Sequence, residues 1–285
     1  MQTTLDLEKE LYDAVHGYIP HDLPGTRRTP EFNESRVRYR MGEETTDSVR
    51  RHVRRVLDLI SPPARILEIG CGTGGWCAGL ALAGFDVVGI EPNEHGVRAC
   101  RTRALRYPHT RQEFHVARGE ELPFPDDSFD AVVSSQVCEH VADRAKLARE
   151  CVRVLRPGGV MQHIMPNYAF PWEPHYRIPW PPRASRPVAR LWLRAIGRDT
   201  RLFDEEIFPT LPGEVIRTFR EAGLVDVRDA YADEVAAKFD RGDFSRPWLT
   251  SAVRVLRRVG AVRLVRGAVL RLELYSSIML TGRKP

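Results

Sequence analysis

Hydrophobic and polar positions follow two alternating patterns along the middle of the chain. Short apolar runs, typical of buried parallel strands, lie at 65–69, 86–90, 113–117, 130–134 and 160–165. Between them, apolar residues recur at helical spacing at 76–83, 94–107 and 143–155. This order of strands and helices predicts a doubly wound α/β fold, in which helices cover both faces of a mostly parallel sheet.

The start of the chain departs from this alternation. Residues 1–45 are polar, and we expect any long element there to be interrupted by Pro20, Pro24, Gly25 and Pro30. A helix is predicted at 46–60, and Ser61-Pro62-Pro63 ends it. We therefore divide the chain into an N-terminal helical extension at 1–60 and an α/β domain at 61–285.

After the fifth strand the regular pattern breaks again. Residues 166–205 are rich in Pro, Trp and Arg, and they are predicted to form a lid inserted over the carboxyl edge of the sheet. A helix at 213–222 and strands at 225–231 and 274–281 complete a seven-stranded sheet. A basic helical stretch is predicted at about 245–272.

The composition fits one α/β domain with insertions. Of the 285 residues 42% are hydrophobic, which supports a substantial core and excludes global disorder. The net charge of +5 comes mainly from arginine and is poor support for a nucleic-acid partner, so none is expected. The five cysteines show no CxxC spacing, which indicates reduced thiols in a cytosolic protein. Since the sequence shows no secretory signal and no bilayer-spanning apolar run, we expect a cytoplasmic location.

The most informative motif follows the first predicted strand and is Glu68-Ile-Gly-Cys-Gly-Thr-Gly74. Glycines at alternate positions let the backbone turn with positive φ and bring a ligand against the main chain. The start of a helix favours polar and anionic groups, so a nucleotide-like ligand is predicted at Gly70 to Gly74. A nicotinamide cofactor normally requires GxGxxG, whereas here the glycine spacing differs and an acid precedes the first glycine. Glu91 ends the next strand, where either class of cofactor uses an acid to accept hydrogen bonds from ribose hydroxyls.

Four ordered motifs resemble the class I S-adenosylmethionine-dependent methyltransferases. The first is the glycine motif, and Glu91 occupies the place of the ribose-binding acid. The other two are Leu122-Pro-Phe-Pro-Asp-Asp-Ser-Phe-Asp-Ala-Val132, which leads into strand four, and the turn Leu155-Arg-Pro-Gly-Gly159 before strand five. The resemblance covers 66–167 well and 211–281 loosely. It implies a Rossmann-like fold, S-adenosylmethionine as cofactor and methyl transfer as the activity.

The resemblance also implies which residues hold the cofactor. They are Glu68, Gly70, Cys71, Gly72, Gly74, Glu91, Pro92, Gly119, Glu120, Ser135 and Gln136. One position departs from the family pattern, because many relatives carry an adenine-binding Asp where this chain has Arg118. An arginine has no hydrogen-bond acceptor, so we expect main-chain groups near Gly119 or another side chain to recognise the adenine.

Methyl transfer from a sulfonium is an in-line displacement, in which the protein mainly aligns nucleophile, carbon and sulfur. An oxygen nucleophile also needs a base, which we expect at the carboxyl ends of strands four and five. Two segments qualify, Cys138-Glu139-His140 and Trp172-Glu173-Pro174-His175-Tyr176. We predict His175 as the base and His140 as the fallback, with structural roles as the alternative for both. The sequence shows no paired-His or Glu-x-x-His spacing, so no catalytic metal is expected.

The segments from 166 onward are expected to choose the acceptor. Substrate contacts are predicted for Trp172, Glu173, Tyr176 and Arg177. Trp172, Tyr176, Trp180 and Trp192 could form an aromatic wall for a cyclic or apolar substrate, or simply close the lid. The arginine-rich stretch 253–272 could lie on an anionic membrane at the inner membrane face, or pack one side on its own domain with its arginines in water.

We therefore predict O-methylation of a small-molecule acceptor, namely a sugar, a lipid-linked glycan or a specialised metabolite. A protein or RNA methyltransferase is the nearest alternative. A non-catalytic S-adenosylmethionine-binding protein and an NAD-dependent oxidoreductase are alternatives from other classes. The sequence does not indicate an oligomeric state.

Overall fold

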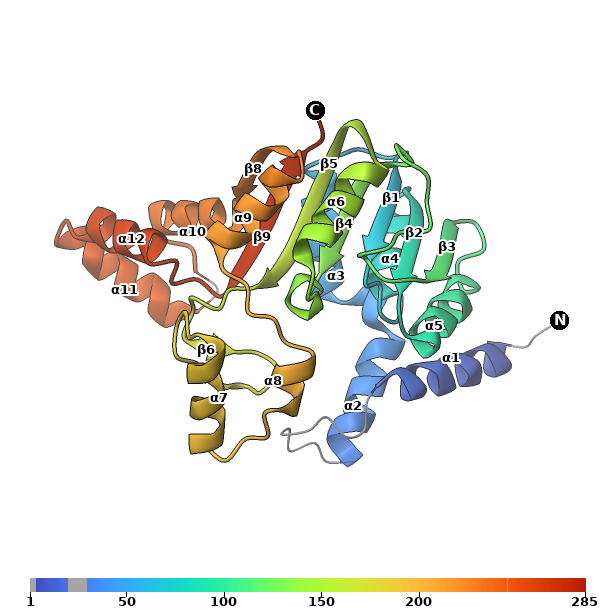
Figure 1. Cartoon of the computed structure of the whole chain (residues 1–285), viewed down its shortest axis with the longest axis horizontal. Coiled ribbons are helices and arrows are strands. Elements are labelled where there is room, and N and C mark those ends of the chain that lie inside the picture. Colours follow the sequence, from blue (N-terminus) through green and yellow to red (C-terminus); the bar gives the residue numbers. More distant parts are fainter. Residues whose placement is uncertain (1–3, 20–29, 245) are drawn as a thin grey trace.

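A computed structural model describes residues 4–19, 30–244 and 246–285. Pro20, Pro24, Gly25 and Ser245, which entered the sequence predictions, lie outside the described residues. Figure 1 shows a central sheet with helices on both sides and two groups of helices that project from it.

A seven-stranded sheet with the order β3-β2-β1-β4-β5-β9-β8 forms the centre of the molecule (Figure 1). Its strands are β1 (Arg65–Ile69), β2 (Asp86–Glu91), β3 (Arg111–Val116), β4 (Phe129–Ser135), β5 (Leu155–Pro166), β8 (Val225–Asp229) and β9 (Ser277–Arg283). Strands β1 to β5 run parallel, and β9 pairs antiparallel with both β5 and β8. The predicted mostly parallel, seven-stranded α/β fold is confirmed.

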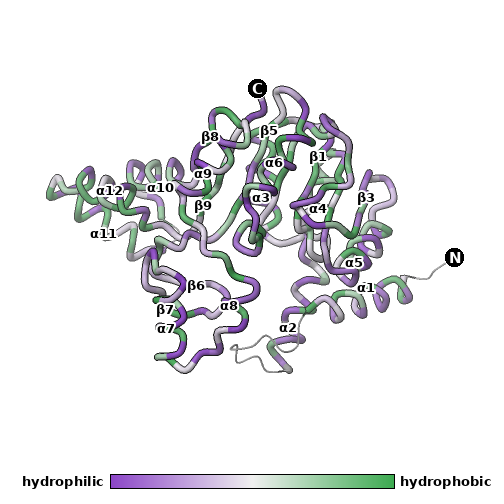
Figure 2. Tube along the Cα trace, in the orientation of Figure 1, coloured by the Kyte–Doolittle hydropathy of each residue, from purple (hydrophilic) through white to green (hydrophobic). Residues whose placement is uncertain are grey.

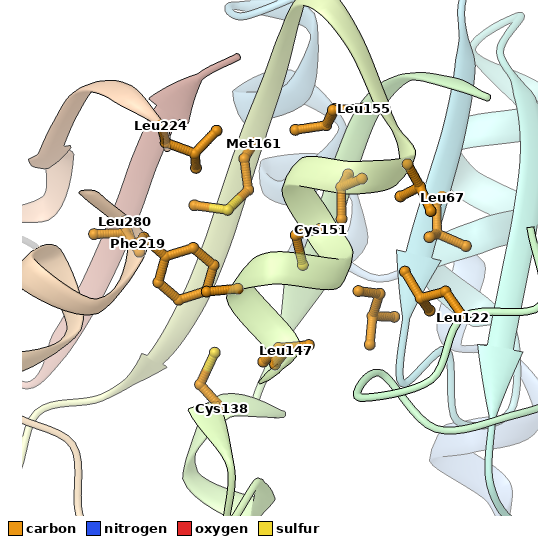
Figure 3. Packing of buried hydrophobic residues seen from close by; sticks show 14 of the residues in the cluster. Leu67, Leu122, Cys138, Leu147, Cys151, Leu155, Met161, Phe219, Leu224 and Leu280 are labelled. Atoms are coloured by element: carbon orange, nitrogen blue, oxygen red, sulfur yellow. The ribbon is translucent and has the colours of Figure 1, made fainter. Parts of the chain in front are cut away.

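Both faces of the sheet are covered, because successive side chains of a buried strand point to opposite sides. On one face Ile66 packs with side chains of α3 (Asp47–Leu57), α4 (Gly75–Leu82) and α5 (Glu94–Ala104). On the other face Leu67 belongs to a cluster with α6 (Arg144–Val154) and α9 (Pro212–Glu221). Figure 3 shows this second cluster, in which Phe219 and Cys151 lie against Met161 of β5.

The topology places a binding edge between β1 and β4. These strands are neighbours in the sheet, yet the chain runs from β1 outward to β2 and β3 before it returns to β4. Ligands of open α/β sheets bind at the carboxyl ends of strands where the order reverses in this way. The glycine turn follows β1 and the Glu139–His140 segment follows β4, so both lie at this edge.

The N-terminal extension is more helical than the sequence predicted. It contains α1 (Thr4–Tyr18), α2 (Pro30–Met41) and the short 3₁₀ helix η1 (Glu43–Thr45). The expectation of interruptions at Pro20 to Pro30 agrees with the bounds of these helices, because α1 ends at Tyr18 and α2 begins at Pro30, but neither helix was itself predicted. In α1 the buried Leu11, Ala14 and Val15 recur at helical spacing and pack against Ala99 of α5.

The segment after β5 forms a compact unit at the carboxyl edge of the sheet (Figure 1). It consists of the hairpin strands β6 (Trp172–Glu173) and β7 (Ile178–Pro179), followed by α7 (Arg186–Ala195) and α8 (Arg201–Glu205). Tyr168, Trp180 and Phe203 are among the buried side chains of a core that belongs to this unit alone. We call residues 166–207 the lid.

The C-terminal helices gather at one end of the molecule's long axis (Figure 1). They are α10 (Ala230–Arg241), α11 (Pro247–Arg258) and α12 (Val262–Arg271). Helix α10 was not predicted, and the strand expected at 225–231 ends at Asp229, because the side chain of Asp229 accepts a hydrogen bond from the Tyr231 backbone N–H and caps the helix. The basic stretch forms two helices with a break near Gly260, whose φ is 71°. Along α11 and α12 hydrophobic and hydrophilic residues alternate (Figure 2).

Candidate functional site

The turn between β1 and α4 has the conformation that its glycines predict. Gly70, Gly72 and Gly74 have φ values of 70°, 57° and 80°, a region that side chains disfavour. A Cβ atom at Gly70 would lie 2.3 Å from Cγ2 of Val137, in the segment after β4. The glycine therefore allows the turn to approach the segment that carries Glu139 and His140.

Buried acids surround this turn. At the end of β2, Glu91 accepts hydrogen bonds from the backbone N–H groups of Gly72 and Asn93, both at 3.1 Å. Glu68 in β1 is buried, and its carboxylate accepts a hydrogen bond from the Cys77 thiol at 3.1 Å. Burial raises the pKa of Glu68 to about 8. Glu43 of η1 is also buried and accepts a hydrogen bond from the Thr73 hydroxyl at 3.2 Å.

These residues fit S-adenosylmethionine. The ligand carries positive charge on its sulfonium and its amino group, and buried carboxylates without a full set of cationic partners favour such a ligand. The carboxylate of Glu91 has lone pairs beyond the two that it shares with main-chain N–H groups, so it could also accept from a ribose hydroxyl. Positive φ at Gly70 and Gly72 gives the main chain the sharp turn that follows β1, where we expect the cofactor.

The other predicted cofactor residues lie along the same edge of the sheet. Cys71 is buried within the turn, and Pro92 directly follows Glu91. Ser135 ends β4, and Gln136 follows with a φ of 58° while its N–H donates to the carbonyl of Ile164 at 2.7 Å.

The loop after β3 carries the expected adenine site. Gly119 is packed so closely that a Cβ atom there would lie 2.7 Å from Cδ1 of Leu147 and 3.0 Å from Cγ2 of Ile69. Glu120 is half-buried, whereas Arg118 is exposed and forms an isolated β-bridge with Glu121. The exposed guanidinium is compatible with the expectation that main-chain groups near Gly119 recognise the adenine.

The sequence interpretation missed the N-terminal residues that cover the glycine turn. The hydroxyl of Tyr18, at the end of α1, lies 3.3 Å from the point where a Cβ atom of Gly72 would stand. Burial raises the pKa of this phenol, and the charge of Glu91 adds to the effect. Glu43 approaches the same turn from η1. No local pattern marks Tyr18 or Glu43, because their position depends on how residues 4–45 fold back over the sheet.

The two predicted bases, His140 and His175, come together although they belong to different segments. Their ring centroids lie 5.0 Å apart with an angle of 81° between the planes. The Nδ1 atom of His175 lies 2.6 Å from Oε1 of Glu173, and Nδ1 of His140 lies 2.8 Å from the carbonyl oxygen of Glu206. Each ring is therefore oriented through Nδ1, which leaves Nε2 as its remaining nitrogen.

The surroundings shift the pKa of both rings. Desolvation by the surrounding side chains lowers the pKa of His140, although part of this side chain is exposed, and the neighbouring His175 adds to the effect. Burial also acts to lower the pKa of His175, but the hydrogen bond and the charge of Glu173 outweigh it, so the net shift is upward.

Glu139 is the third member of this cluster. Its side chain is fully buried, burial raises its pKa to about 7, and neither carboxylate oxygen has a hydrogen-bond partner from another described residue. One ligand atom each from Glu139, His140 and His175 lies within 4.8 Å of the others. The expectation of no metal rested on spacing along the chain, which cannot reveal a cluster that the lid completes.

The predicted substrate residues divide into exposed and internal ones. Trp172 is 45% exposed and Arg177 is exposed, so both could meet a ligand. Glu173 is fully buried and accepts hydrogen bonds from the Tyr168 hydroxyl at 3.0 Å and the Tyr176 N–H at 2.5 Å, so it orients His175 within the lid.

The aromatic wall expected from Trp172, Tyr176, Trp180 and Trp192 is not an open surface. Tyr176 and Trp180 are buried in the core of the lid, and the Tyr176 hydroxyl donates to the Asp199 carbonyl at 2.9 Å. The Trp192 indole donates to the Pro179 carbonyl at 3.0 Å. The alternative, in which these rings close the lid, describes their packing.

Comparisons with known proteins agree with this architecture. A family model described as a methyltransferase domain matches residues 67–162. A probable S-adenosylmethionine-dependent methyltransferase of Mycobacterium tuberculosis is 41% identical over 102 residues, which are 36% of this chain and 35% of that protein. A ubiquinone biosynthesis O-methyltransferase of Sinorhizobium medicae is 37% identical over 97 residues, 34% of this chain and 39% of that protein. The chain thus matches little more than a third of the length of these relatives.

Solved structures with little sequence identity share the fold. A phosphoethanolamine N-methyltransferase of Haemonchus contortus superposes with a TM-score of 0.56 at 15% identity, over 99% of this chain and 58% of that one. A geranyl diphosphate C-methyltransferase of Streptomyces coelicolor gives 0.54 at 16% identity, over 99% and 100%. The family match decides between the two cofactor classes in favour of S-adenosylmethionine and against a nicotinamide. Residues 67–162 are thus similar to the catalytic domain of S-adenosylmethionine-dependent methyltransferases, and the chain shares the class I fold with solved methyltransferases.

Proposed function

We propose that the chain transfers a methyl group from S-adenosylmethionine to an oxygen of a small-molecule acceptor. The observation that carries this proposal is the position of the His175–Glu173 pair at the same sheet edge as the glycine turn. Glu68, Glu91, Gly70 and Gly72 would hold the cofactor, which supplies an activated methyl group when bound.

The role proposed for His175 follows from its hydrogen bond to Glu173. The carboxylate accepts the Nδ1 proton at 2.6 Å and leaves Nε2 with a lone pair. As the oxygen–carbon bond forms and the carbon–sulfur bond breaks, the hydroxyl proton passes to Nε2, and Glu173 stabilises the imidazolium. His140 lies beside this ring and is the second candidate.

A small acceptor is supported by the lid and by the relatives. The lid has its own core and carries His175 over the carboxyl edge of the sheet. Two matching relatives are named as enzymes of quinone compounds, a ubiquinone biosynthesis O-methyltransferase and a 2-methyl-6-phytyl-1,4-hydroquinone methyltransferase of Synechocystis. We therefore favour a hydroxyl on a ring, as in a sugar, a lipid-linked glycan or a specialised metabolite, over a protein or RNA acceptor.

Calorimetry and single-turnover kinetics test the proposal. We expect the protein to bind S-adenosylmethionine and not NADH, and to methylate members of a panel of cyclic hydroxyl compounds. His175→Ala should retain cofactor affinity and lower the methylation rate by about 10²- to 10⁴-fold, the range for loss of a general base. Glu173→Gln should lower it less, because the ring remains but loses its orientation.

The matched control is His115→Ala. His115 also pairs with a glutamate, Nε2 to Oε1 of Glu113 at 2.8 Å, but it lies on β3 away from the lid. This variant should keep the wild-type rate. Full turnover in His175→Ala would remove the base assignment, whereas cofactor binding without methylation of any acceptor would favour the non-catalytic alternative.

We also propose that α11 and α12 contact an anionic membrane surface, which would bring the enzyme to a lipid-linked acceptor. Val255, Val259 and Leu264 are 57%, 68% and 78% exposed on these helices. Exposed arginines lie among them: Arg254, Arg258, Arg263 and Arg271. Apolar side chains between cations are typical of helices that lie in a membrane interface. Within the described residues, no helix combines the length and the apolarity that a membrane span requires.

A further inference from the structure

We propose that Glu139, His140 and His175 form a binding site for a divalent transition-metal cation, of the class of Zn²⁺, Co²⁺ and Mn²⁺. The inference deepens the proposed function, because it places the cation where the acceptor oxygen would bind. It rests on the mutual distances of the ligand atoms, on the unpartnered carboxylate of Glu139 and on the way each imidazole is held.

Glu139 supplies the first observation. Its carboxylate is fully buried in η2 (Cys138–His140), and neither oxygen has a hydrogen-bond partner from another described residue. A buried carboxylate without partners is costly, and native structures normally satisfy such groups with a donor or a cation. One carboxylate oxygen of Glu139 and one ring nitrogen each of His140 and His175 all lie within 4.8 Å of one another.

The hydrogen bonds of the two histidines supply the second observation. His175 uses Nδ1 to contact Oε1 of Glu173 at 2.6 Å, and His140 uses Nδ1 to contact the Glu206 carbonyl at 2.8 Å. Both acceptors are oxygens, so both rings carry their proton on Nδ1 and have a lone pair on Nε2. Metal-bound histidines are held in this way, with one nitrogen on the cation and the other donating to a carboxylate or carbonyl.

The backbone holds the ligand segments against each other. The N–H of Phe208 donates to the Glu139 carbonyl at 2.6 Å, and the Arg144 guanidinium donates to the Phe208 carbonyl at 3.2 Å. These bonds tie the irregular segment that follows the lid to η2, next to the Glu206 carbonyl that holds His140. Two segments therefore hold the cluster together: η2 and the segment at Glu206 to Phe208.

The donor set indicates the kind of cation. Two imidazoles and one carboxylate suit a first-row transition cation or zinc, whereas Mg²⁺ and Ca²⁺ prefer oxygen ligands. Three protein ligands leave at least one coordination position for water or an acceptor oxygen, as in catalytic rather than structural metal sites. His140 is exposed, which gives a cation access from solvent.

The site gives His175 two alternative roles. With a cation bound, Nε2 of His175 is a ligand and cannot also accept the acceptor's proton. A hydroxyl that replaces water on the cation is acidified and releases its proton to solvent before methyl transfer. Without a cation, His175 is the base proposed above.

Co²⁺ titration of the full-length protein tests the site. The protein is first dialysed against a chelator, and binding is followed by calorimetry and by the visible d–d absorption of Co²⁺. We expect one Co²⁺ per chain, with no thiolate-to-cobalt charge-transfer band, because the ligand atoms of the cluster come from Glu139, His140 and His175 and not from the buried cysteines. Glu139→Gln and His140→Gln should each weaken Co²⁺ binding at least about tenfold.

Controls separate this site from other outcomes. His140→Gln changes an exposed side chain, so its thermal unfolding should match that of the wild type even if Glu139→Gln unfolds. His115→Ala removes a histidine from a comparable His–Glu pair and should bind Co²⁺ like the wild type. Absence of Co²⁺ binding by the wild type, or equal affinity in wild type and His140→Gln, would overturn the metal site.

The metal site and the proposed function can fail separately. Affinity for S-adenosylmethionine is measured in the same samples without metal. Cofactor binding and methylation that persist in chelator, together with absent Co²⁺ binding, would reject the cation and keep His175 as the base. Co²⁺ binding without any affinity for S-adenosylmethionine would reject the proposed function and keep the metal site.

Discussion

Single buried acids define the chemistry of the cofactor side. Glu68 lies in the core beside the glycine turn, where the Cys77 thiol is a neutral donor to its carboxylate. Burial raises the pKa of Glu68 to about 8, so the side chain is largely protonated at neutral pH when no ligand is bound. A cationic ligand at the turn would favour the ionised form.

The pH dependence of stability follows from this shift. The pKa of Glu68 rises from 4.5 to about 8 on folding, so between these values the native state holds a proton that the unfolded state has lost. The free energy of unfolding should therefore fall as pH rises from about 5 to 8, and level off above. One unit of pKa difference is worth about 1.4 kcal/mol, so the total loss from Glu68 should reach a few kcal/mol.

Urea unfolding of the ligand-free protein at pH 5 and pH 9 measures this effect. Glu68→Gln cannot ionise, so its stability should decline less than that of the wild type over the same interval. Glu121→Gln, which changes an exposed acid in the loop after β3, serves as the control and should follow the wild type. Identical pH profiles for Glu68→Gln and wild type would contradict the shifted pKa.

Arg103 of α5 attaches the N-terminal elements to the α/β domain. Its side chain is fully buried and forms an ion pair with Glu44 of η1. The guanidinium also donates to the carbonyls of Thr73 at 2.9 Å and Met41 at 3.1 Å. One side chain thus joins α5, the glycine turn and the end of α2, and it holds η1 where Glu43 meets the turn.

Arg103→Met should destabilise the protein by about 3–5 kcal/mol, because it removes the fully buried one of the two arginines that pair with Glu44 and takes away a donor to the Thr73 and Met41 carbonyls. Affinity for S-adenosylmethionine should fall as well, since the Thr73 carbonyl and η1 lose a common anchor. Chemical unfolding and calorimetry measure the two effects. The comparison variant is Arg50→Met, whose exposed pair with Asp47 should contribute less than about 1 kcal/mol. A loss for Arg103→Met as small as that for Arg50→Met would show that the contact does not anchor the extension.

The lid has its own hydrophobic core and carries the proposed catalytic pair on a hairpin. Tyr176 and Trp180 pack inside it, so its shape does not depend on a substrate. Glu173 and His175 lie on the hairpin between β6 and β7, where the 2.6 Å hydrogen bond fixes the imidazole. A rigid hairpin at the end of β5 is suited to position a catalytic group, because it loses little conformational freedom in the transition state.

Over the whole molecule, the α11–α12 group and α1 lie at opposite ends of the long axis (Figure 1). Both ends expose apolar side chains, but arginines surround those of α11 and α12. Each arginine near an anionic lipid surface contributes about 1 kcal/mol of attraction. Of these two ends, as far as the structure describes them, the α11–α12 end therefore fits the membrane-facing surface proposed above.

Vesicle co-sedimentation tests this surface. The protein should bind vesicles that contain phosphatidylglycerol, bind neutral phosphatidylcholine vesicles several-fold less, and lose the difference at high salt. Leu264→Asp should reduce binding several-fold by placing a carboxylate on the apolar strip of α12. Leu5→Asp changes an equally exposed leucine, 80% exposed on α1, and should bind like the wild type. Equal loss in both variants would contradict a role for α11 and α12.

Strands that form an apolar run in the sequence could be predicted. Helices whose buried side chains are covered by distant segments could not. The central strands β1, β2 and β4 were expected within one residue of their observed bounds, because each is a short and mostly buried apolar run. Helix α1 was missed because three buried side chains, Leu11, Ala14 and Val15, are a weak pattern until Ala99 of α5 covers them. Helix α10 likewise depends on a core that Val253 and Tyr275 complete.

The sequence by itself determined the cofactor class. Glu68, the glycines of the turn and Glu91 lie on consecutive elements, so their relative positions follow from local backbone geometry. The tertiary structure decided which groups gather where we propose that the methyl acceptor binds. Glu139 and His140 follow β4, whereas His175 lies on a lid inserted after β5, so their proximity depends on the packing of distant segments. Spacing along the chain does not encode that distance, which is why two histidines predicted as separate bases are, in the folded protein, parts of one cluster.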